Sequence, residues 1–88
     1  MMTEARRQEF EQDFRHDAEH LGEQSKYFIG AYHRACDYVR KYSLKDSEVE
    51  DELFSPARNL RMAVAMARLS WRYALMVEEV MAYRTEAQ

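Results

Sequence analysis

The sequence predicts an all-α protein, a long antiparallel helical hairpin that pairs with a second copy to form a four-helix bundle. Three observations support this prediction. Apolar residues recur at alternating spacings of four and three along two long stretches, the pattern of packed helices. The 88 residues include only two glycines and one proline, Gly22, Gly30 and Pro56, the residue types that most often interrupt a helix. A chain this short encloses little core of its own, and its single cysteine, Cys36, excludes an internal disulfide.

The first helix is expected over about residues 3–43. Its apolar positions are Phe14, Ala18, Leu21, Phe28, Tyr32, Ala35, Val39 and Tyr42. Ser25 fills the one gap in this register, which continues through both glycines. The pattern therefore favours one unbroken helix, although each glycine costs about 1 kcal/mol relative to alanine. The alternative is a three-helix bundle that breaks near Gly22.

Residues 44–55 form an acidic connection, and residues 1–88 make a single helical domain. Ser55 followed by Pro56 predicts the start of the second helix, because serine is a favoured N-cap and proline is tolerated at the first helical position. The acidic run before this point suits the positive end of the helix dipole. The second helix is expected over about residues 56–84.

The second helix has too much apolar surface for a single antiparallel partner to cover. Its predicted dimer or core face comprises Met62, Met66, Leu69, Tyr73, Met76 and Val80, with Ala63, Ala67 and Ala74 beside them. Leu60, Val64, Trp71 and Leu75 widen this face. The sequence therefore predicts a homodimer. In this interpretation the methionines at helical spacing pack in the core. In the alternative they form an adaptable surface for partner helices.

The net charge of −3 is unevenly distributed along the chain. Residues 1–25 and 46–55 are acidic, whereas residues 26–45 and 56–88 are basic. This pattern suits opposite charges that meet within or between chains, and it disfavours nucleic acid as the main ligand. The chain has no apolar stretch typical of a signal peptide or a membrane span, so we expect a cytoplasmic protein that does not engage membranes.

Two groups of residues are candidates for binding a protein partner with an acidic surface. On the outer side of the first helix the group is Tyr27, Arg34, Tyr38 and Lys41. On the second helix it is the row Arg58, Arg61, Arg68 and Arg72. Tyrosine and arginine are enriched at interface hot spots, and arginine pairs well with carboxylates. The alternatives are packing against a neighbouring helix for the first group and ion pairing with the first helix or a dimer mate for the second.

The polar side of the first helix offers the only candidates for chemistry. Asp13, His16, Asp17 and His20 share one side, and two histidines four residues apart suit a divalent metal. Arg15 and His20 have the Arg-x4-His spacing, which resembles the short motif of the HEPN-type ribonucleases. That resemblance implies an RNase acting across a dimer cleft, although the motif of that family lies late in the domain and here it lies early.

No nucleophile, base and acid come together in the pattern, and no glycine-rich phosphate loop is present. The leading hypothesis is a non-enzymatic, homodimeric protein-binding module without a cofactor: an adaptor, an escort, or an inhibitor that occludes a partner sterically and electrostatically. A nucleic-acid-binding protein that uses the same Arg and Tyr faces is the alternative. A metal-binding or RNase-like bundle is the third hypothesis.

Overall fold

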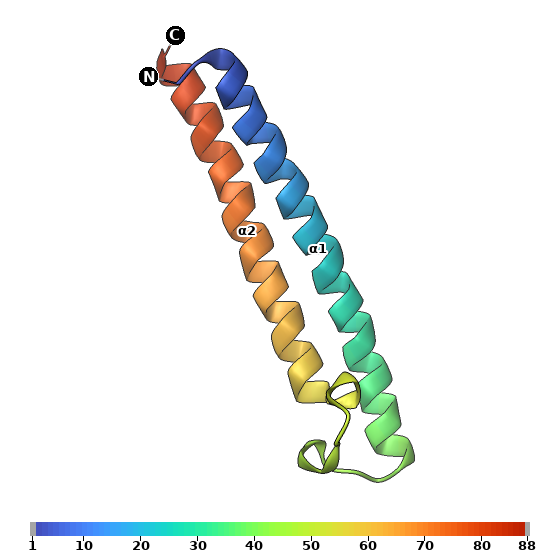
Figure 1. The fold of residues 1–88 in the computed structure, drawn as a ribbon. Coiled ribbons are helices and arrows are strands. Elements are labelled where there is room, and N and C mark those ends of the chain that lie inside the picture. The colour runs from blue at the N-terminus through green and yellow to red at the C-terminus, as the bar shows by residue number, and fades with distance from the viewer. Residues whose placement is uncertain (1, 88) are drawn as a thin grey trace.

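The computed structural model describes residues 2–87 and confirms the all-α helical hairpin. Its elements are α1 (Glu4–Lys41), the 3-10 turns η1 (Asp46–Glu48) and η2 (Glu52–Phe54), and α2 (Pro56–Ala87). The two turns close one end of the hairpin, and the N- and C-terminal ends of the helices lie together at the other end (Figure 1).

Helix α1 is continuous through Gly22 and Gly30, so the three-helix alternative is wrong. The physical reason is the unbroken register: the apolar side keeps facing α2 on both sides of each glycine, and packing along the helix outweighs the glycine penalty. Thr3 caps the helix, since its Oγ1 accepts a hydrogen bond from the Arg6 N–H at 3.2 Å.

The C-terminus of α1 ends in a Schellman motif. The Leu44 N–H donates to the Val39 carbonyl at 2.8 Å, and the Ser43 N–H donates to the Arg40 carbonyl at 3.3 Å. This reversal requires a left-handed residue, and Ser43 adopts it with φ of 52°. A residue with a Cβ therefore occupies the position that glycine usually fills.

Helix α2 begins at Pro56, as predicted, and the connection caps it. Asp46 Oδ1 accepts hydrogen bonds from Ser55 Oγ and from the Ala57 N–H, each at 3.0 Å. Ser55 Oγ in turn accepts a hydrogen bond from the Arg58 N–H at 3.2 Å. The Asp46 carboxylate, nine residues upstream of Ser55, and the Ser55 hydroxyl thus both accept hydrogen bonds from backbone N–H groups in the first turn of α2.

The expected register of α1 holds from Phe14 to Val39, whose members are all buried or half-buried, whereas its last member, Tyr42, is 55% exposed. On α2 the side that packs on α1 consists of Asn59, Ala63, Met66, Ser70, Tyr73, Val77 and Val80. This seam runs between two rows that the sequence pattern had placed on one face. The first row runs from Met62 to Val80, and the second comprises Ala63, Ala67 and Ala74. Leu69 and Met76, expected on that face, remain 38% and 41% exposed at its edge.

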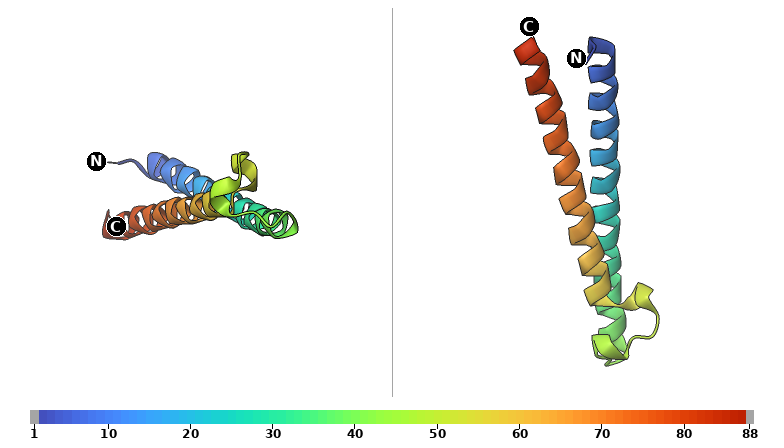
Figure 2. Two further views of the ribbon diagram at one scale, coloured as in Figure 1. Left: turned by 90° about the horizontal axis from the view of Figure 1, so that it is seen from below. Right: turned by 60° about the vertical axis from the view of Figure 1, so that its left-hand side comes forward.

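The hairpin is a rod without a deep core. Its extents are 62 × 16 × 14 Å, and its helices cross at a shallow angle (Figure 2). The buried hydrophobic residues are Ala31, Ala35, Ala63 and Val77, and no large side chain in the described part of the chain is fully buried. Neither helix, over the residues described, has a stretch apolar enough to cross a bilayer.

Candidate protein-binding surfaces

A groove of about 190 Å³ lies at the closed end of the hairpin, where η2 approaches α1. Its lining residues are Tyr27, Phe28, Ala31, Arg34, Leu53, Phe54 and Asn59, which we call the closed-end groove. Two of its large apolar side chains face solvent, since Leu53 is 68% exposed and Tyr27 is 59% exposed. The groove combines an apolar lining with one guanidinium group.

Hydrogen bonds hold the loop side of this groove in place. Asn59 is 4% exposed, and its side-chain amide donates to the carbonyls of Leu53 at 3.0 Å and of Ser55 at 2.9 Å. Asp51 accepts a hydrogen bond from the Leu53 N–H at 3.0 Å. The exposed Leu53 side chain is therefore presented by a fixed backbone, as a preformed binding site requires.

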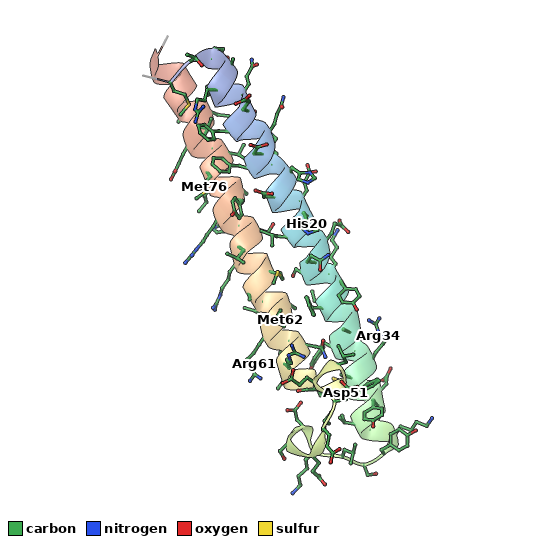
Figure 3. All side chains as sticks on the ribbon, in the orientation of Figure 1. His20, Arg34, Asp51, Arg61, Met62 and Met76 are labelled. Atoms are coloured by element: carbon green, nitrogen blue, oxygen red, sulfur yellow. The ribbon has the colours of Figure 1, made fainter. Side chains whose placement is uncertain are left out.

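Two of the four residues predicted on the outer side of α1 line the groove. The Arg34 guanidinium lies over the Tyr27 ring, 5.9 Å from its centre. Figure 3 shows Arg34 on the side of α1 away from α2. A cation held over an aromatic face in this way still has donors free for a carboxylate.

The other two residues lie outside the lining. Tyr38 is half-buried and stacks on Phe54 with 4.5 Å between ring centres, and its ring also lies 4.9 Å from that of Tyr42. Lys41 sits over the Tyr42 ring at 5.5 Å. Tyr38 thus supports η2 from beneath, which is the neighbouring-element packing that the sequence analysis left open.

The loop half of the groove was not predicted from the sequence. Leu53, Phe54 and Asn59 are not among the candidate binding residues that the sequence pattern predicts. The available signal was an apolar pair at the end of an acidic run, followed by an amide in the first turn of a helix.

A second surface is the apolar side of α2 that faces away from α1. Its members, which we call the outer apolar face, are Leu60, Val64, Ala67, Trp71, Ala74 and Leu75, all of them exposed. Trp71 is 67% exposed, although tryptophan is highly buried on average in folded proteins. Spacings of four, three and four from Leu60 to Trp71 make this face a second helix-packing seam beside the one that contacts α1.

A shallow depression lies on this face. It is lined by Val64, Ala67, Arg68, Trp71 and Arg72. The first four occupy positions i, i+3, i+4 and i+7, which form the hole of knobs-into-holes packing. No residue of the described chain fills this hole.

The predicted arginine row borders the outer apolar face. Arg58 pairs with Glu52 of η2 at 2.9 Å, so its ion-pair partner lies in the connection rather than on the first helix. Arg61 points away from α1 (Figure 3). Within residues 2–82, whose side chains are described, Arg61, Arg68 and Arg72 form no ion pair. Three guanidinium groups therefore remain available to another molecule.

The residues considered for catalysis or metal binding do not come together. Arg15 turns towards α2, where its Nη2 lies 3.5 Å from the Met81 sulfur, and it also pairs with Glu11. His16 and His20 are exposed. Among the described residues, no group of three or more His, Cys, Asp or Glu side chains is arranged to hold a metal ion.

The main electrostatic cluster lies at the open end of the hairpin. Arg7 is 3% exposed and pairs with Glu4 at 2.7 Å and with Glu11 at 2.9 Å. The hydrogen bonds to Glu4 and Glu11 raise the pKa of Arg7 above its ordinary value. The guanidinium groups of Arg7 and Arg15 lower the pKa of Glu11.

Further along α1, hydrogen bonding to Cys36 raises the pKa of the Tyr32 hydroxyl. None of these three groups with a shifted pKa lies in the closed-end groove or on the outer apolar face.

Comparison with known proteins yields no match, whether to a protein-family model, to a characterised protein or to a solved structure.

Proposed function

We propose that this chain is a non-enzymatic protein-binding module that works as a homodimeric four-helix bundle. The observation that carries the proposal is the amount of organised apolar surface that one hairpin leaves uncovered, led by the outer apolar face with Trp71 at 67% exposure. Large exposed apolar patches mark interaction sites in soluble proteins.

The surface area supports the dimer. The hairpin exposes 6931 Å², roughly 1,400 Å² more than a compact monomer of 10.6 kDa is expected to expose. Burying an area of that order on each chain falls in the range of stable homodimers. Two hairpins packed face to face provide the core that one lacks.

In this proposal the closed-end groove receives the partner. The apolar rim of Leu53 and Tyr27 suits a large apolar side chain, and Arg34 suits a neighbouring carboxylate. The cognate segment is therefore an acidic peptide or loop with one apolar anchor. The rigid bundle acts as an adaptor, an escort or an inhibitor by covering the surface to which that segment belongs.

Site-specific photocrosslinking tests this role. Tyr27 is replaced by p-benzoylphenylalanine, and the protein is irradiated in lysate of its native host after nuclease treatment. The expected result is a discrete protein adduct, distinct from the self-crosslinked dimer, which Leu53→Asp and Arg34→Glu each abolish. The same photoreactive residue at the exposed Glu9, near the open end, is the matched control. Equal adducts from both positions, or none from Tyr27, would contradict the groove.

Nucleic acid is a second candidate ligand, and one observation favours it. The exposed Trp71 ring lies beside Arg68 and Arg72, which have no carboxylate partner in the described part of the chain. Aromatic rings with flanking arginines stack on unpaired bases. This function predicts that the protein binds single-stranded oligonucleotides with an affinity that falls steeply with salt. Fluorescence anisotropy across a salt series decides between the two functions.

A further inference from the structure

We propose that the two copies pack with α2 of each on α1 of the other, with the two-fold axis parallel to the helices. This inference rests on the proposed dimer and adds its arrangement and the residues that specify it. The occupant of the outer apolar face is therefore α1 of a second copy of this chain.

Residues of α1 share the side of the rod on which the outer apolar face lies. One depression is lined jointly by Arg15, Ala18, Glu19, Ala74, Val77, Glu78 and Met81. Glu19 of α1 and Ala74 of α2 thus border the same surface. A partner that covers the outer apolar face also meets this side of α1.

Two hydrogen bonds set the alignment of the helices along the rod. Ser70 Oγ donates to the Ala18 carbonyl at 2.7 Å, and Ser25 Oγ donates to the Ala63 carbonyl at 2.9 Å. Ala18 is therefore level with Ser70. At a rise of about 1.5 Å per residue, Arg68 is level with the turn of α1 between Glu19 and Glu23.

The charges distinguish the two ways of stacking two hairpins. In the first arrangement α2 packs on α2 of the partner, and the two-fold axis passes through the middle of the outer apolar face. Arg68 would then face Arg68 of the partner subunit. Glu19 would then lie near Glu23 of the partner subunit. If α2 packs on α1 of the partner, height along the rod is preserved, and Arg68 faces Glu19 and Glu23 of the partner subunit. Opposite charges meet only in the second arrangement.

The groups concerned are available for this pairing. Arg68 and Glu19 are exposed, and neither has an ion-pair partner among the described residues. Glu23 makes one contact, a 3.4 Å pair with Lys26 in which both side chains are more than 70% exposed. Such an exposed pair stabilises little and does not compete strongly with a new partner.

Gly22 provides an independent observation. A Cβ at this position would lie 3.5 Å from Ser70 Oγ, an ordinary contact, so packing within the hairpin does not require glycine. Glycine in the middle of a helix nevertheless costs about 1 kcal/mol. In the proposed arrangement Gly22 lies level with Ala67 of the partner subunit, and two small residues there let the helices approach closely.

Charge reversal in the full-length protein tests the arrangement, with dimer dissociation constants from sedimentation. We expect Arg68→Glu and Glu19→Arg each to weaken the dimer by roughly tenfold or more, and the double variant to recover most of the loss. Lys45→Glu, the same charge change on an exposed residue of the connection, is the matched control and should leave the constant unchanged. Circular dichroism verifies that each variant is folded.

The outcomes separate this inference from the function on which it rests. A dimer that is tightened or unaffected by Arg68→Glu would overturn the arrangement and leave the dimer standing. A monomeric wild-type protein would overturn both. Gly22→Gln adds a second criterion: it should weaken the dimer without unfolding the hairpin, and unchanged dimerisation would contradict the close approach.

Discussion

At the residue scale, a buried arginine holds the open end of the hairpin. Arg7 lies on the side of α1 that faces α2, one turn before Glu11 and two before Phe14, so it continues the packing register as a charged residue. Its two carboxylate partners, Glu4 and Glu11, satisfy the guanidinium that burial would otherwise penalise. Long arginine side chains also cover apolar surface with their methylene groups.

This cluster predicts a pH dependence of stability. Because Arg7 and Arg15 lower the pKa of Glu11 in the folded chain, the ionised carboxylate stabilises the fold above its unfolded-state pKa near 4.5, and that stabilisation is lost as the pH falls below this value. Urea unfolding between pH 3 and pH 7 should show the loss. Glu11→Gln should flatten this part of the profile, and Glu9→Gln, on an exposed neighbour, should not. A profile unchanged by Glu11→Gln would contradict the cluster.

At the element scale, the lengths and register of the helices were predictable because periodic burial determines both. The pattern from Phe14 to Val39 predicted one continuous α1, and Ser55–Pro56 predicted where α2 starts. The seam of α2 was not predictable, because apolar residues cover most of its circumference. Several rows satisfied the same spacing, and the packed one includes the polar residues Asn59 and Ser70.

The candidate site was predictable only in part. Periodicity placed Tyr27 and Arg34 on the outer side of α1, whereas the loop half of the groove depends on hydrogen bonds between Asn59 and carbonyls four and six residues upstream. Irregular backbone of this kind has no periodic signature. Tyr38 illustrates the same limit, since its ring stacks on Phe54 of η2, an element that lies on no predicted helix face.

The end of α1 gives an element-scale prediction. Ser43 occupies the left-handed position of the Schellman motif, where a Cβ is unfavourable. Ser43→Gly should therefore raise the free energy of unfolding by about 0.5–1 kcal/mol, measured by urea denaturation. Ser47→Gly, in the η1 turn where no positive φ occurs, should give no gain. Equal effects of the two substitutions would contradict the assigned cap geometry.

At the scale of the whole molecule, the chain is a thin rod rather than a compact domain. The radius of gyration is 18.8 Å, whereas a compact chain of this length is expected near 12 Å. Small residues make up the buried core, and the largest apolar side chain, Trp71, faces solvent. Pairing two rods along the outer apolar face would thicken the molecule and bury this residue, and the closed-end groove of each chain would remain open at the same end of the bundle.

We propose that the functional unit is a pair of hairpins, and the mass of the protein in solution distinguishes a pair from a single chain. Light scattering coupled to size-exclusion chromatography at micromolar concentration should give twice the 10.6 kDa of one chain. Trp71→Glu should shift the mass towards that of one chain. A wild-type mass equal to one chain, with the hairpin folded by circular dichroism, would contradict the proposed dimer.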